Sequence, residues 1–469
     1  MRRNVVIPAV VFALVVGVVV AVVALTTPVR RFPVGGLALG GDAALLFTRY
    51  NDYGDSRFFA ELVGVDGDAR WSDDTTPVRG AEALGFTGAV QAGDSLVMLG
   101  VDKAGVEWLG ALAAADGQPR WWIALPGLAG REAGGRIGPM LSSDGARVFV
   151  VHETKTHFGA DGGPTSDRLD VRALADGSAL WSLGEAELGA GRLDVRRVGG
   201  HLLVASAGGR EVRDVDPATG KTLATLPFGN ILCSGADGFA AVAEDRLTWV
   251  PLAPGAAPVP LDLRDPGLSW SNTCGFRGDD LVVNLERPTG WSVVRVVRAT
   301  GRVQFDLPLG TGVLGTEPVM TGAQLPRFVP FAYCGSDGPV PWCELAIADV
   351  DLGRVSERHH VIRSGELVPI MTGERAWVWA DFFATLVAVD PASGKLGAAT
   401  RFAGIIGHDL RADDIAADRL WLLGMDHEHP GDLPFAVVDL KSGAVVRTNG
   451  PVEASDATAT VPELMAGRP

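Results

Sequence analysis

A serine, an aspartate and a histidine in this sequence have neighbours that suit a hydrolytic triad. Ser95 lies in the run Gly93-Asp94-Ser95-Leu96, and Asp426 and His429 have the D-x-x-H spacing that can supply an acid and a base. Such a triad is defined by geometry, and enzymes with this motif hold the serine at a strand-to-helix turn. The apolar runs on both sides of Gly93-Asp94 instead predict a strand-turn-strand hairpin. We therefore do not expect Ser95 to be catalytic.

Two histidines in the same segment could bind a metal ion. His427 and His429 alternate with acids, so both imidazoles would face one side of an extended segment and could hold a divalent metal together with Asp426. An exposed polar loop explains the same residues, and we favour that interpretation. We predict no metal site, no cofactor and no catalytic residue.

Composition narrows the fold and the partners. The chain has 469 residues, of which 47% are apolar, so it can build a large core. It contains 61 glycines and 29 prolines without the three-residue period of collagen, which favours β structure with many short turns. The formal net charge of −15 repels phosphate backbones, so we expect no nucleic-acid partner.

An internal repeat organises most of the chain. A short apolar run, a turn that ends on glycine and a second apolar run recur nine times at a mean spacing of about 47 residues. Two further strand-like runs precede each hairpin, so each unit has four antiparallel strands. Radial repetition of four-stranded sheets predicts an all-β β-propeller. The turn glycines are Gly67, Gly117, Gly177, Gly220, Gly255, Gly301, Gly353, Gly394 and Gly443.

Two residue types recur around these glycines. An aspartate stands four residues before the glycine in several repeats, where its carboxylate can accept local backbone N–H bonds. These turn acids are Asp216, Asp349, Asp390 and Asp439. An aromatic residue stands four positions after the glycine, on one face of an outer strand, where it can pack between neighbouring sheets. The predicted docking aromatics are Trp71, Trp121, Trp181 and Phe305.

The hairpin pattern resembles the repeat of the pyrroloquinoline-quinone-like, or quinoprotein-type, propellers. The runs VDPATGKTL and VDPASGKL are its best copies, and Trp71, Trp121 and Trp181 match the docking tryptophan of that family. The resemblance implies seven or eight blades; we expect eight, with seven to nine compatible with the repeats. Quinone dehydrogenases of this fold carry adjacent cysteines and a calcium-binding set that this sequence does not match. The resemblance therefore favours the non-enzymatic branch.

Cysteine usage points to an oxidising compartment. The even number of four cysteines is compatible with two disulfides. Cys334 and Cys343 bracket one loop, and we expect them to be bonded to each other. Cys233 and Cys274 take equivalent inner-strand positions in successive repeats, so a bond between them would connect adjacent blades.

The amino terminus predicts a membrane anchor. Val5–Leu25 is uncharged and would form a helix about 32 Å long, which matches the hydrocarbon thickness of a bilayer. We therefore expect residues 1–36 to hold a cytoplasmic stub, a single transmembrane signal-anchor and a linker, with the propeller at 37–448. Residues 449–469 lack an apolar period and are expected to be disordered. The propeller would lie outside the cytoplasm of a single-pass cell-membrane protein.

Long loops indicate where a partner would bind. The longest connections join the second and third strands of a unit, and they collect on one rim of a propeller, where a rigid scaffold presents them. The candidate binding residues there are Tyr50, Tyr53, His157, Phe158, Trp342, His427 and His429. We expect a protein- or glycan-binding scaffold without catalysis. The alternative is a quinone- or metal-dependent oxidoreductase or a hydrolase that uses the axial channel.

Overall fold

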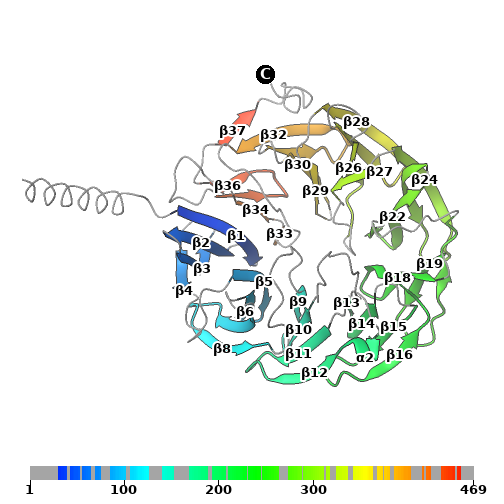
Figure 1. Cartoon of the computed structure of the whole chain (residues 1–469). Coiled ribbons are helices and arrows are strands. Elements are labelled where there is room, and N and C mark those ends of the chain that lie inside the picture. The colour runs from blue at the N-terminus through cyan, green and yellow to red at the C-terminus, as the bar shows by residue number, and fades with distance from the viewer. Residues whose placement is uncertain are drawn as a thin grey trace, which may run out of the picture.

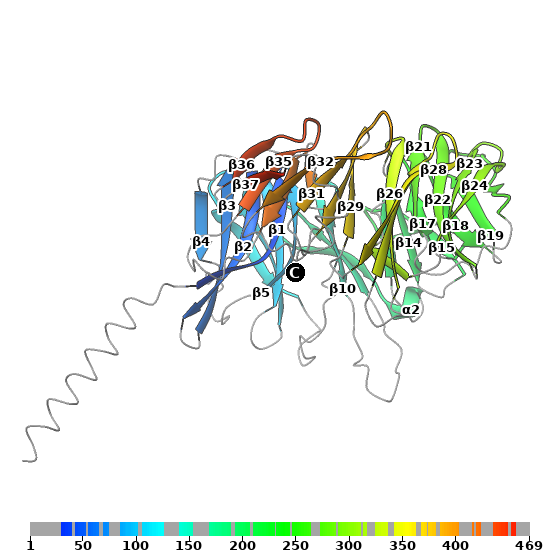
Figure 2. The same ribbon diagram turned by 90° about the horizontal axis from the view of Figure 1, so that it is seen from above.

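The computed structural model describes residues 30–39, 43–52, 55–64, 69–74, 85–101, 106–125, 140–152, 168–188, 193–206, 210–229, 231–243, 246–263, 273–287, 289–310, 313–316, 324–335, 342–362, 367–372, 374–380, 385–402, 415–416, 419–423, 435–448 and 452–455. Within them, nine sheets each contain four strands that are consecutive in the chain and antiparallel. Figure 1 shows the sheets arranged in a ring, and Figure 2 shows that ring from the side. The fold is a β-propeller.

The strands of each blade run outward from the axis in chain order. Blade 1 consists of β1 (Arg30–Leu39), β2 (Ala43–Asp52), β3 (Asp55–Gly64) and β4 (Ala69–Asp74). Blade 2 consists of β5 (Gly85–Ala92), β6 (Ser95–Val101), β7 (Glu107–Ala113) and β8 (Pro119–Ala124). Blade 3 consists of β9 (Met140–Ser143), β10 (Arg147–His152), β11 (Arg168–Ala173) and β12 (Ala179–Leu183). Blade 4 consists of β13 (Leu193–Val198), β14 (His201–Ser206), β15 (Val212–Val215) and β16 (Thr222–Leu226). Blade 5 consists of β17 (Ile231–Ser234), β18 (Gly238–Ala243), β19 (Arg246–Pro251) and β20 (Val259–Pro260). Blade 6 consists of β21 (Thr273–Arg277), β22 (Asp280–Arg287), β23 (Gly290–Val296) and β24 (Val303–Gly310). Blade 7 consists of β25 (Val313–Thr316), β26 (Phe328–Gly335), β27 (Trp342–Asp349) and β28 (Arg354–Ile362). Blade 8 consists of β29 (Leu367–Met371), β30 (Ala376–Ala380), β31 (Thr385–Val389) and β32 (Leu396–Phe402). Blade 9 consists of β33 (Ile415–Ala416), β34 (Arg419–Leu423), β35 (Phe435–Asp439) and β36 (Val445–Thr448). In the described part of the chain, helix is confined to α2 (Glu185–Leu188).

The middle strands of a blade are apolar because both of their faces are covered. Leu96, Val97, Met98 and Leu99 of β6 are consecutive and all fully buried. In an outer strand such as β24, partly buried and exposed residues alternate instead. The core is therefore a series of layers between neighbouring sheets, and contact between β1 and β33 brings the first and last blades together.

The glycine turns have the geometry that their composition predicts. Gly220 has φ of 73°, a conformation that glycine adopts at little steric cost. The Asp216 carboxylate accepts a hydrogen bond from the backbone N–H of Ala218 at 2.8 Å and from the Thr219 hydroxyl at 2.7 Å. These bonds lower the pKa of Asp216, so the turn acid serves a local structural role.

Tryptophans connect the first four blades. Trp71 packs against Gly117 of the next blade and donates from Nε1 to the Ala114 carbonyl at 3.1 Å. Trp121 packs against Gly177 in the same way, with its Nε1 bonded to the Leu174 carbonyl at 2.9 Å. Trp181 likewise packs against Gly220 and donates to the Pro217 carbonyl at 3.1 Å, and Phe305 packs against Gly353.

A disulfide connects blades 5 and 6 near the axis. Cys233 of β17 and Cys274 of β21 are bonded, with their Cα atoms 5.6 Å apart and both residues fully buried. The prediction of an inter-blade bond is confirmed. Cys343 is also disulfide-bonded and lies directly opposite Cys334 in the register of β26 and β27, although the Cys334 side chain lies outside the described residues.

Several expectations need correction. The described residues contain nine blades, so the expected eight is one too few. Strand β1 begins at Arg30, inside the expected linker of residues 1–36, because this segment pairs with β2. Strand β37 (Val452–Ser455) lies in the tail expected to be disordered, where it pairs with β32. The sheet edge supplied the hydrogen-bond partners that the tail alone lacks.

Candidate functional site on the turn face of blades 5 to 8

The connections between first and second strands and the glycine turns between third and fourth strands lie on the same side of an antiparallel blade. We call this side of the ring the turn face. From blade 5 to blade 7 it carries arginine–aspartate pairs that cross from one blade to the next. Arg298 of blade 6 bonds to Asp237 of blade 5 at 2.6 Å, and its Cζ lies 4.8 Å from the centre of the Trp249 ring. The guanidinium thus combines an ion pair with a cation–π contact.

Asp351 connects blades 6 and 7. Its carboxylate accepts from Arg277 at 2.7 Å and from Arg295 at 3.0 Å, and both arginines belong to blade 6. The hydrogen bond from Arg277 is the main cause that lowers the pKa of Asp351, and the same bond raises the pKa of Arg277. Both charges are therefore fixed at neutral pH, and the two turns are held in one arrangement.

Asp349 anchors the same turn of blade 7. Its side chain is fully buried and accepts from Arg327 at 2.8 Å and from the backbone N–H groups of Asp351 and Leu352. Burial acts to raise the pKa of Asp349, but the bonds from Arg327 and the two backbone groups together hold the pKa below its usual value. The pair fixes Arg327 at the edge of blade 7.

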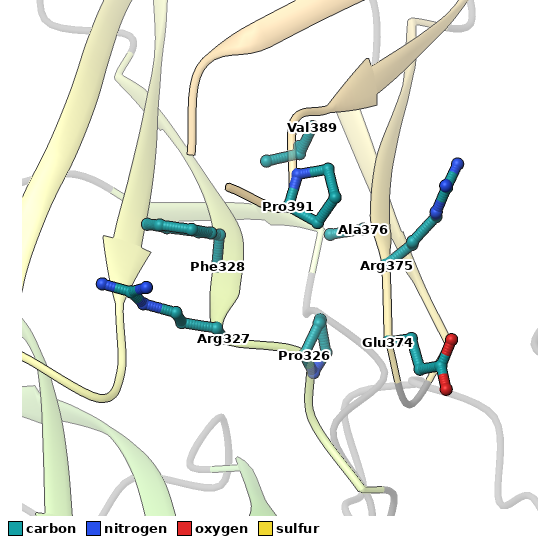
Figure 3. Close-up of a pocket in the computed structure, with 8 residues that line it drawn as sticks. All are labelled: Pro326, Arg327, Phe328, Glu374, Arg375, Ala376, Val389 and Pro391. Atoms are coloured by element: carbon teal, nitrogen blue, oxygen red, sulfur yellow. The ribbon is translucent and has the colours of Figure 1, made fainter. Parts of the chain in front are cut away.

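A shallow hollow lies beside Arg327, between blades 7 and 8. It is a surface depression open to solvent, and its apolar part is formed by Phe328, Ala376 and Val389 with two prolines. Figure 3 shows Arg327 and Phe328 on one side and Ala376, Arg375 and Glu374 on the other. The complete lining is Pro326, Arg327, Phe328, Glu374, Arg375, Ala376, Val389 and Pro391.

Two arginines of the hollow occupy equivalent positions. Arg327 and Arg375 each stand directly before the second strand of their blade, β26 and β30. Small-molecule sites usually enclose about 300–1,000 Å³. This hollow is far smaller and open to solvent, so it suits surface contact and not the enclosure of a ligand. The hollow can therefore contact an apolar side chain of a partner, and Arg375 places a guanidinium at its rim, whereas Arg327 is already paired with Asp349.

The residues of the triad motif are not assembled for catalysis in the described structure. Ser95 begins β6 after a turn in which Gly93 has φ of 61°, as the sequence predicts. Arg120 donates to the Ser95 hydroxyl at 2.6 Å and to Asp94 at 2.6 Å, and it lowers the pKa of Asp94. A cation beside the hydroxyl is no general base. Asp426 and His429 lie outside the described residues.

The predicted binding loops lie largely outside the described residues. Tyr53, His157, Phe158, His427 and His429 all fall there. Two other candidates belong to strands and not to loops. Tyr50 lies in β2 and pairs with Arg57, and Trp342 begins β27 and pairs with Gly335. The backbone pairing continues further toward the tip of these hairpins than the polar sequence suggested.

Sequence reasoning missed the residues of the hollow. Arg327, Phe328 and Arg375 belong to no motif, and their shared position before a second strand was the one available signal. Among the described residues, no group of three or more His, Cys, Asp or Glu side chains could hold a metal ion. In that same part of the chain no helix is long and apolar enough to cross a bilayer, and Val5–Leu25 lies outside it.

Comparison with known proteins identifies no family. No family model and no curated protein matches the sequence. Similar solved structures include apo AztD from Citrobacter koseri, with 12% identity, a TM-score of 0.39 and coverage of 80% of this chain and 95% of that one. Quinohemoprotein alcohol dehydrogenase from Comamonas testosteroni has 10% identity and a TM-score of 0.39, over 88% of this chain and 72% of that one. Dihydro-heme d1 dehydrogenase NirN has 16% identity and a TM-score of 0.41, over 78% and 73%. These similarities transfer no activity to this chain.

Proposed function

We propose that this protein is a membrane-anchored extracytoplasmic binding scaffold that engages a protein partner through the turn face of blades 7 and 8. The hollow between these blades carries the proposal. Its shallow apolar surface suits contact with an apolar side chain of the partner, and binding energy in protein interfaces is concentrated in a few such contacts. Arg375 at the rim of the hollow favours a partner with a carboxylate close to that contact.

The surroundings of the hollow support a rigid docking surface. The Arg327–Asp349 pair fixes one side of it, and the two ion pairs of Asp351, with Arg277 and with Arg295, connect the same turn to blade 6. Preorganised groups lose little freedom on binding, so more of the contact energy appears as affinity.

The location is part of the same proposal. The apolar run Val5–Leu25 would anchor the chain, and the bonded Cys233–Cys274 pair suits an oxidising compartment. Protease added outside sealed membrane vesicles of known orientation reports on which side of the membrane the propeller lies.

Site-specific crosslinking tests the partner site. A photoactivatable residue in place of the exposed Glu374 is expected to form a discrete protein adduct in membranes that contain the full chain. The same residue in place of Asp116, an exposed acid on the turn face of blade 2, serves as the control and should form none. Adding Arg375→Glu should lower the yield at position 374 about tenfold, since it reverses the charge at the hollow.

Two results would overturn the proposal. One is equal labelling at positions 374 and 116, and the other is a yield at position 374 that Arg375→Glu leaves unchanged. An adduct that glycosidases remove and proteases leave intact would replace the protein partner with a glycan.

A further inference from the structure

The outermost strand of a propeller blade has backbone groups with no neighbour on one side, and exposed edges of this kind pair readily with other chains. Most outer strands here carry a feature that blocks such pairing. Charged residues occur in β4, β24, β28 and β36; β8 begins with proline and arginine; and β20 has two residues. Strand β32 is covered by β37.

The outer strands of blades 3 and 4 carry none of these features. Strand β12 has the sequence ALWSL and β16 has the sequence TLATL, both without charge or proline. Four of the five residues of β16 are exposed, and within the described residues it is hydrogen-bonded to β15 alone. Leu223 of β16 is 61% exposed and Leu180 of β12 is 46% exposed, at equivalent positions of neighbouring blades.

The chain itself contains an example of strand addition to an outer edge. Strand β37 pairs antiparallel with β32, opposing Ala454 to Thr400 and Ser455 to Ala399. The covered edge also includes Arg401 and Phe402, which oppose Glu453 and Val452, so residues of opposite charge face each other there. An outer strand of this fold therefore accepts an antiparallel neighbour when no like charges oppose each other.

We propose that β16 is a self-association edge, at which two copies of this protein pair their β16 strands antiparallel about a two-fold axis at Ala224. In that register Thr222 opposes Leu226 of the second copy, and Leu223 opposes Thr225. A strand that pairs with itself brings like charges together wherever it is charged, and like charges in opposed positions are destabilising. Strand β16 has no charged residue, so no like charges would meet when it pairs with the β16 strand of a second copy. The two four-stranded blades would then form one continuous eight-stranded sheet across the dimer.

Cysteine crosslinking of the full chain tests this edge. Ala224→Cys places a thiol at the two-fold axis, where two copies would oxidise to a disulfide-linked dimer that non-reducing electrophoresis detects. Val446→Cys is the matched control, since Val446 is exposed on the outer strand β36 beside Arg447. The described native cysteines are all bonded, so they do not compete for the new thiol. We expect the dimer with Ala224→Cys and monomer with Val446→Cys.

Sedimentation of the detergent-solubilised chain provides the second measurement. The wild type should show a monomer–dimer equilibrium, and Ala224→Asp should weaken it at least about tenfold because it opposes two carboxylates at the axis. Ala224 is exposed, and an unchanged circular dichroism spectrum verifies that the variant is folded. Wild-type protein that stays monomeric at every concentration would overturn the proposal. So would equal crosslinking of the two cysteine variants, or crosslinking of Ala224→Cys to a different protein.

Discussion

Blades 1 to 4 and blades 5 to 7 solve the same packing problem with different chemistry. In the first region, a tryptophan from the outer strand of each of blades 1 to 3 packs on the turn glycine of the following blade and donates to a backbone carbonyl there. In the second region, a disulfide and arginine–aspartate pairs cross the interfaces. A propeller interface therefore needs a close contact at each junction, and several kinds of side chain can supply it.

The junction between blades 5 and 6 shows why the tryptophan–glycine contact is replaced by other contacts. Blade 5 has Val259 where blades 1 to 3 have tryptophan, and its short outer strand brings the Pro260 backbone against Gly301. A Cβ on Gly301 would lie 2.0 Å from the Pro260 carbonyl oxygen. The backbone occupies the space of the missing ring, and the Cys233–Cys274 bond secures the inner end of the same interface.

A third variant occurs between blades 8 and 9. Trp377 comes from the second strand of its blade, yet it packs on the turn glycine Gly443 and donates to the Leu440 carbonyl at 3.2 Å. Leu440 stands three residues before the glycine, as Ala114 does before Gly117. The acceptor position is thus retained while the donor comes from another strand.

Removal of the disulfide should produce the largest effect on the second region. The Cys233–Cys274 bond closes a loop with a sequence separation of 41 residues, which stabilises the folded state by about 4 kcal/mol in the chain-entropy model. The double variant Cys233→Ala with Cys274→Ala should lose that amount in chemical denaturation followed by tryptophan fluorescence. An unchanged denaturation midpoint would show that the ion pairs hold this interface without the bond.

A glycine substitution should produce the next largest effect, in the first region. Gly177 and Gly145 both have positive φ, at 73° and 84°. A Cβ on Gly177 would lie 2.7 Å from the Trp121 ring, whereas a Cβ on Gly145 would meet nothing within 4 Å. Gly145→Ala should cost about 1 kcal/mol from backbone strain, and Gly177→Ala should cost about 2 kcal/mol more because it overpacks the interface. Equal losses of thermal stability in the two variants would refute the docking role of Trp121.

The smallest expected effect concerns the pH dependence of the ion pairs. Because the pKa of Asp351 is lowered in the folded protein, its contribution is complete above the unfolded pKa of about 3.9 and is lost as the pH falls through the lowered value. Asp351→Asn should lower stability at neutral pH by less than about 1 kcal/mol, since the pair is partly exposed, and should flatten the loss on acidification. Thermal unfolding between pH 3 and 7 measures both, with Asp279→Asn at a fully exposed side chain as the control. Identical acid profiles for Asp351→Asn and the wild type would contradict the bridging role.

Much of the fold could be predicted because it depends on interactions between residues that are close together within single repeats. The Asp216 turn, the positive φ at Gly220 and the position of Trp181 follow from a few neighbouring residues and recur along the chain. The candidate site could not be predicted in the same way. Arg327 and Arg375 are 48 positions apart in the sequence and form one hollow because two blades meet there.

The sequence by itself determined the four-stranded repeat, its turn chemistry, the docking tryptophans and the pairing of Cys233 with Cys274, since each depends on local spacing or on equivalent repeat positions. The nine repeats also matched the nine blades, and only the family resemblance lowered the expected number to eight. The tertiary structure alone decided the use of Trp377 from a second strand and the addition of β37 to β32. The physical reason is that these features depend on how wide the ring is and which sheet edge lies within reach. Those properties arise from packing between blades and leave no periodic pattern in the chain.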